Sequence, residues 1–118
     1  ELGEIEKAKK LIDSMQHAGW DVNVLRGMQF RAERKWQESI DKFEKSLRES
    51  EAINPRHSED YEFAELLVEY ARVYLERGQE GDRERAHKLL DEALEIYQKI
   101  GAKGDIERII AKKKLLTA

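Results

Sequence analysis

Histidines and carboxylates are the side chains of this sequence that could bind a metal or act as acids and bases. His17, His57 and His87 fall in separate segments, without the paired spacing that places two ligands on one helix face. The chain has no cysteine, which excludes thiolate ligands and thiol nucleophiles. Carboxylates are abundant, but abundance alone does not define a catalytic pair. The sequence therefore predicts no catalytic site, metal or cofactor, and it places the histidines at surfaces or helix ends.

Two short motifs could bind anions, but both have simpler explanations. The segment Gly101–Gly104 lacks the spacing of a phosphate loop and is expected to be a turn that ends a helix. The basic run Lys112–Lys114 lies near the end of a predicted helix, where cations favour the negative end of the helix dipole. Elsewhere the 22 basic and 25 acidic side chains are interleaved. No nucleic-acid partner is expected, because phosphate binding needs a concentrated basic face.

Composition points to one small helical domain. The 118 residues are 40% hydrophobic and 40% charged, with one proline. No apolar run approaches the roughly 20 residues that span a bilayer, so we expect no membrane contact. The absence of cysteine is compatible with a reducing cytoplasm, which is the location we expect. The chain opens Glu1-Leu2-Gly3 and runs directly into a helical pattern, which suggests a piece of a longer polypeptide.

Apolar residues recur at helical spacing in six stretches. The predicted helices run from Glu4 to Ala18, from Asp21 to Glu33, from Trp36 to Ile53, from Ser58 to Gly78, from Asp82 to Gly101, and from Asp105 to near the C-terminus. We expect N-caps at Asp21, Ser58 and Asp82, and glycine-ended helices at Gly19, Gly78 and Gly101. Most connections are short, so successive helices should form antiparallel hairpins.

Small and large side chains repeat at a fixed spacing in two parts of the chain. The order small, large, small occurs at Ser39, Phe43 and Ser46, and again at Ala86, Leu90 and Ala93. Upstream, a small residue stands three positions before an aromatic, at Gly27 and Phe30 and at Ala71 and Tyr74. The small residues should let two helices approach closely, while the aromatic fills the gap between neighbouring hairpins.

Segments Leu25–Phe30 and Ser39–Leu47 together resemble a tetratricopeptide repeat, whose period is about 34 residues. Tyr70–Tyr74 with Ala86–Leu94 resembles another. The resemblance implies an all-α, right-handed superhelical stack of antiparallel helix hairpins with about six helices. It divides one domain into the second helix of a truncated repeat (1–19), a full repeat (20–53), a linker (54–58), a full repeat with about three extra residues in its turn (59–101) and a capping helix (102–118). The last part is also similar to the final repeat of large bacterial and archaeal signalling proteins.

In such a stack, the first helix of each repeat lines a concave groove. The groove residues that the resemblance implies are Val24, Met28, Arg31, Val68, Arg72 and Leu75. Apolar side chains beside two arginines suit an amphipathic helix or an acidic peptide, unless these positions pack on an adjacent domain. We therefore expect a scaffold module that binds a protein or peptide. The alternative is an effector-sensing or self-associating segment of a signalling regulator, in which the groove takes a small ligand or a neighbouring domain. Separately, the first predicted helix lacks its hairpin partner, so an exposed apolar face around Leu11, Ile12 and Met15 could drive homodimerisation.

Overall fold

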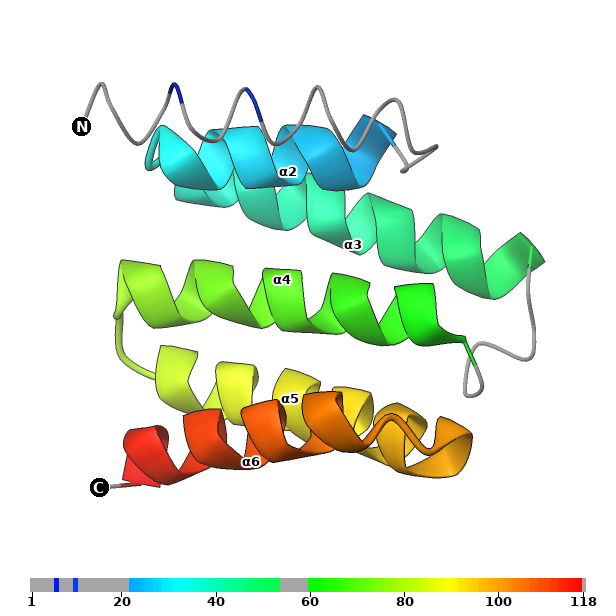
Figure 1. Cartoon of the computed structure of the whole chain (residues 1–118). Helices are drawn as coiled ribbons and strands as arrows, with labels where there is room; N and C mark the ends of the chain where they lie inside the picture. The colour runs from blue at the N-terminus through cyan, green and yellow to red at the C-terminus, as the bar shows by residue number, and fades with distance from the viewer. Residues whose placement is uncertain (1–5, 7–9, 11–21, 54–59, 118) are drawn as a thin grey trace. The chain divides into compact units, whose positions relative to one another are not determined.

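The computed structural model describes residues 6, 10, 22–53 and 60–117, and all regular structure within them is α-helical. The five helices bounded there are α2 (Val22–Ala32), α3 (Trp36–Ile53), α4 (Tyr61–Arg77), α5 (Asp82–Ile100) and α6 (Lys103–Thr117) (Figure 1). The all-α prediction is confirmed for these residues. The predicted first helix falls almost wholly outside them, as do the caps at Asp21 and Ser58 and the linker 54–58. Within the described ranges, no helix is both long and apolar enough to cross a bilayer.

The chain divides into two compact units, residues 1–49 and 50–118. In the first unit, α2 and α3 approach closely at Gly27. A Cβ atom there would lie 2.9 Å from Cε2 of Phe43, which is fully buried. The Ser39 hydroxyl donates a hydrogen bond of 2.6 Å to the Gly27 carbonyl. The small residues thus allow the close contact that their spacing predicts, whereas Phe30 remains partly exposed beneath Lys35.

In the second unit, α5 packs against both α4 and α6, and Figure 1 shows the three helices running in alternating directions. The small, large, small positions of α5 are all buried, at Ala86, Leu90 and Ala93. On α4, Ala71 and Tyr74 are buried as well. Burial of these apolar side chains provides the main stabilisation of this unit.

The structure defines the N-terminal ends of the three helices in the second unit. The cap of α4 is Asp60, whose Oδ1 accepts hydrogen bonds from the amides of Glu62 and Phe63. The expected cap at Asp82 is wrong, because Gly81 occupies the N-cap position and Asp82 is the first residue of α5. The expected start of the last helix at Asp105 is also wrong. The Ala102 carbonyl already accepts a helical bond from Ile106, so α6 begins at Lys103.

The three extra residues of the α4–α5 hairpin are spread over its two helices and its turn. Phe30 precedes Ser39 by nine positions, while Tyr74 precedes Ala86 by twelve. According to the bounds of the helices, this difference of three residues is shared equally by the end of α4, the turn and the start of α5. One residue lengthens α4 after its aromatic, one lengthens the turn, and one lengthens α5 before its small residue. One of the three extra residues therefore lies in the turn between the helices, and the other two lie in the helices themselves.

Candidate functional site

The predicted groove residues fall into two sets, one in each unit, and the structure buries three of their four apolar members. Val24 and Met28 in the first unit and Val68 in the second are nearly inaccessible to solvent. Transfer of a valine or methionine side chain out of water is favourable in free energy, so these residues pack inside the protein rather than line a surface. The residues of this prediction that reach the surface are Arg31, Arg72 and Leu75. Of the six predicted groove residues, these three remain candidates for contact with a ligand.

Leu75 borders a hollow at one end of the α4–α5 hairpin, which we call the Leu75 hollow. Its volume is about 240 Å³, and it is lined by Tyr74, Leu75, Gly78, Gln79 and Arg83. Arg72 lies one turn before Leu75, and residues three apart share a helix face. Its side chain is 42% exposed and lies 3.5 Å from Glu69. An apolar side chain therefore lies beside arginines that face water.

A buried carboxylate fixes the turn that borders the Leu75 hollow. Asp82 is only 1% exposed. Its two oxygens accept a bidentate pair of hydrogen bonds from Arg77, at 2.9 and 2.8 Å, and Oδ2 also accepts from the backbone amide of Gln79 at 2.9 Å. Arg85 donates a further bond of 3.0 Å. Because a hydrogen-bonded carboxylate satisfies several donors at once, this cluster holds the end of α4, the turn and the start of α5 together.

Hydrogen bonding keeps Asp82 ionised to low pH. The bonds from Arg77 lower the pKa of Asp82 to about 2, against the opposing effect of burial, and the Gln79 amide adds to the decrease. The guanidinium of Arg77 also lies 5.5 Å from the ring centroid of Tyr74. A carboxylate with these partners serves structure, since every one of its strong acceptor positions is already engaged.

A second polar cluster joins α4, α5 and α6. The hydroxyl of Tyr97, a fully buried residue, donates a hydrogen bond of 2.5 Å to Oε1 of Glu65. Arg108 reaches the same oxygen at 3.3 Å and also bonds Asp105 at 3.0 Å. Burial, with the adjacent Glu65 carboxylate, raises the pKa of the Tyr97 hydroxyl well above its usual range. Tyr97 is therefore a neutral donor, and the cluster fastens three helices rather than activating a nucleophile.

These two clusters are what the sequence patterns missed. Asp82 carries a local signal, because an arginine five residues earlier faces it across a short turn. Glu65 and Arg108 are 43 residues apart and show no local pattern. Among the described residues, no three His, Cys, Asp or Glu side chains gather in a way that could hold a metal ion. His17 and His57 lie outside those residues, and His87 borders a separate groove between α5 and α6.

No family model, curated protein or solved structure matches the chain. Membership of the tetratricopeptide-repeat family therefore stays a prediction.

Proposed function

We propose that the chain is a tetratricopeptide-like scaffold module that binds a protein or peptide as part of a larger regulatory protein. The observation that carries the proposal is the Leu75 hollow, where an apolar side chain lies beside arginine on a braced helical hairpin. Two features support the repeat class. Small residues mediate the close helix contact at Gly27, and the same residue spacing is buried in α5.

The surface favours a ligand that combines an apolar side chain with a carboxylate. Leu75 supplies the apolar contact, while Arg72 and Arg83 supply guanidinium groups. A guanidinium binds a carboxylate through two parallel hydrogen bonds, which gives both affinity and orientation. Arginine is also enriched among the residues that dominate binding energy at protein interfaces. A peptide with an acidic residue next to a leucine or phenylalanine has this chemistry.

The bonds to Asp82 favour binding because they order the site in advance. Gln79 lines the Leu75 hollow, and its backbone amide is bonded to Asp82. A loop that is already ordered loses less conformational entropy when a ligand arrives. Binding at this turn is therefore less costly than binding at a turn without such a brace.

Peptide selection tests the proposal directly. A displayed library of random peptides would be selected on the immobilised chain, and affinities would be measured by fluorescence anisotropy. We expect enrichment of peptides with paired acidic and apolar residues. Arg72→Glu should weaken their binding by about tenfold or more, since a charge-assisted hydrogen bond contributes roughly 1.5–3 kcal/mol. Leu75→Asp should weaken it similarly.

The matched control is Lys99→Glu, which makes the same charge change at an exposed position near the end of α5. It should leave the affinity within about twofold. Circular dichroism melting would show that each variant folds. If no peptide is enriched, or if the selected peptides bind the Arg72 and Leu75 variants as well as the parent chain, the Leu75 hollow is not the binding site.

A further inference from the structure

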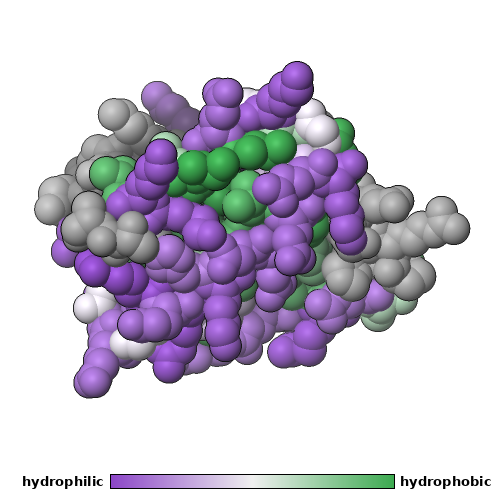
Figure 2. All heavy atoms as spheres, turned by 90° about the horizontal axis from the view of Figure 1, so that it is seen from below, coloured by the Kyte–Doolittle hydropathy of each residue, from purple (hydrophilic) through white to green (hydrophobic). Residues whose placement is uncertain are grey.

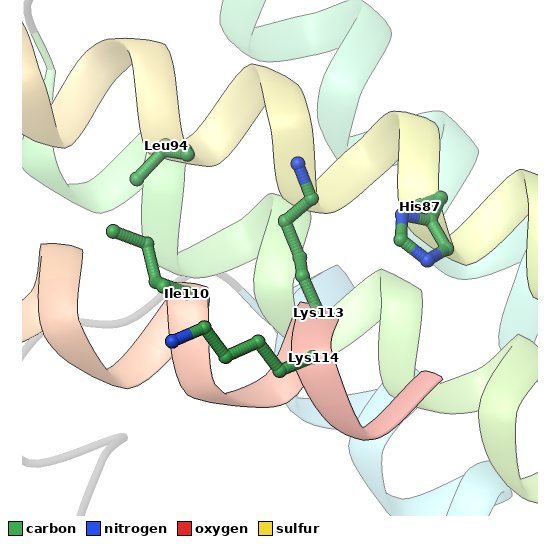
Figure 3. Close-up of a pocket in the computed structure, with 5 residues that line it drawn as sticks. All are labelled: His87, Leu94, Ile110, Lys113 and Lys114. Atoms are coloured by element: carbon green, nitrogen blue, oxygen red, sulfur yellow. The ribbon is translucent and has the colours of Figure 1, made fainter. Parts of the chain in front are cut away.

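A second groove lies in the second unit, between α5 and α6, and we call it the α5–α6 groove. It is lined by His87, Leu94, Ile110, Lys113 and Lys114, with a volume of about 330 Å³ (Figure 3). His87 and Leu94 are seven residues apart, while the three α6 residues are spaced by three and four. Both spacings keep side chains on one helix face. The lining residues therefore extend for about two turns along α5, or roughly 10 Å, and for about one turn along α6.

The floor of the α5–α6 groove is apolar. Figure 3 shows the side chains of Leu94 and Ile110 pointing toward each other from the two helices. Ile110 is 39% exposed, although its neighbour Ile109 is fully buried. Figure 2, which views the molecule from the side of α5 and α6, shows hydrophobic side chains gathered in a strip that hydrophilic ones border. A single exposed isoleucine is ordinary, but an exposed apolar floor between two helices is a feature of docking grooves.

The walls of the α5–α6 groove are basic. Lys113 and Lys114 approach it from α6 and His87 from α5, and no carboxylate is among the lining residues. Lys113 forms an ion pair with Asp91, which holds its ammonium group across the two helices. Two of the three residues of the basic run, Lys113 and Lys114, thus line the α5–α6 groove.

We propose that the α5–α6 groove binds an amphipathic helix of a partner protein, with an apolar stripe flanked by acidic residues. The groove is elongated along two antiparallel helices, and a third helix fits between two others by inserting its side-chain ridge. The apolar floor accepts the stripe, and the lysines attract the acidic flanks. The residues involved lie on α5 and α6, so this inference does not depend on the Leu75 hollow of α4 and the turn after it.

A designed peptide tests this inference. The probe is a fluorescein-labelled helical peptide of about 18 residues, or roughly 27 Å, with leucines on one face and glutamates on both sides of them. A matched peptide has lysine at every glutamate position. We expect the acidic peptide to bind at least about tenfold more tightly in anisotropy titrations. Rising salt should weaken this binding, because it screens exposed charges.

Variants of the chain locate the binding site. Lys114→Glu and Ile110→Asp should each weaken binding of the acidic peptide by about tenfold. Lys103→Glu, an exposed control on the same helix, should not. In a chain that also carries Leu75→Asp, which removes the apolar contact of the Leu75 hollow, the losses caused by Lys114→Glu and Ile110→Asp should persist, which separates the α5–α6 groove from the Leu75 hollow. Addition of the peptide should shift the methyl NMR signals of Leu94 and Ile110.

Three outcomes would overturn the inference. The basic peptide could bind equally well, folded Lys114 and Ile110 variants could keep full affinity, or the two methyl signals could stay unchanged. Sedimentation of the chain alone provides the remaining comparison. If it shows a dimer that Ile110→Asp abolishes, the occupant is a second copy of the chain and not a partner helix of the proposed kind.

Discussion

The turns of the two helical hairpins each connect two successive helices, but different interactions stabilise them. Between α2 and α3 the connection is Glu33–Lys35, with Arg34 in the left-handed region at φ 61°. Between α4 and α5 it is Gly78–Gly81, with both terminal glycines in that region. The first hairpin has no buried carboxylate among its described residues. The second has Asp82, which is bonded across the turn.

This difference shows how added length can change what stabilises a hairpin. In the shorter hairpin, contact is steric, because Gly27 lets the ring of Phe43 approach the backbone of α2. In the longer hairpin, Arg77 ends α4 and Asp82 begins α5, so the turn brings opposite charges together. The first arrangement requires that position 27 carries no side-chain methyl group, and the second requires that the Asp82 carboxylate keeps its hydrogen-bond donors. Each can be removed by one substitution.

Asp82→Ala should give the largest loss of stability. It leaves Arg77, whose side chain is only 14% exposed, without its bidentate partner. Removal of one member of a buried pair costs about 3 kcal/mol or more in the free energy of unfolding. Arg85→Ala is the control, since it removes a partner of the same carboxylate that is 54% exposed and should cost less than about 1 kcal/mol. Urea denaturation would measure both, and equal losses would contradict the role assigned to burial.

Acidification should remove the stabilisation that the Asp82 carboxylate provides. The folded pKa of Asp82 is lowered from 3.8 to about 2, mainly by its bonds with Arg77, so the unfolded state binds this proton more readily. The stabilisation is therefore complete above about pH 4 and is lost as the pH falls toward 2. The difference in unfolding free energy between the parent chain and Asp82→Asn isolates this group from other carboxylates. The difference should be constant from pH 7 to 4 and narrow below it, and a constant difference down to pH 2 would contradict the prediction.

Gly27→Ala tests the steric arrangement of the first hairpin. The new methyl group would lie 2.9 Å from the Phe43 ring, and overpacking of this kind costs about 1–3 kcal/mol. Gly104→Ala is the matched control, because no atom lies within 4 Å of the corresponding position in α6. There alanine should stabilise the helix by about 0.5 kcal/mol. Thermal unfolding of the two variants should shift in opposite directions, and a stabilised Gly27→Ala chain would show that the contact is not tight.

The sequence predicts the local features of these hairpins better than the distant ones. Helical spacing placed α2 to α5 nearly correctly, since apolar periodicity and glycine ends act within one helix. The pattern also anticipated the close approach of two helices at Gly27, where the ring in contact is that of Phe43. Val68 was expected in a groove but is buried, because a single helix pattern does not say which apolar residue faces a neighbour. Pairs such as Glu65 and Arg108 depend on the folded arrangement of three helices.

Arg34→Gly should produce the smallest effect, and a stabilising one. The ends of α2 and α5 show the same pattern of backbone hydrogen bonds. At the end of α2, the Arg34 amide donates to the Arg31 carbonyl and the Lys35 amide donates to the Phe30 carbonyl. At the end of α5, the Gly101 amide donates to the Gln98 carbonyl and the Ala102 amide donates to the Tyr97 carbonyl. This pattern requires a left-handed residue, which is Arg34 at φ 61° in α2 and Gly101 at φ 74° in α5. The left-handed conformation strains any residue with a Cβ atom but not glycine.

Glycine at position 34 should therefore raise the free energy of unfolding by about 0.5–1 kcal/mol, after its greater freedom in the unfolded chain offsets part of the relieved strain. Gly101→Ala makes the opposite change in the same motif and should cost about 1 kcal/mol. Urea midpoints at neutral pH would measure both. Because Gly101 has no atom within 4 Å of its Cβ position, its loss would report backbone strain alone. If Arg34→Gly destabilises the chain, the Arg34 side chain contributes more to the first hairpin than its backbone strain costs.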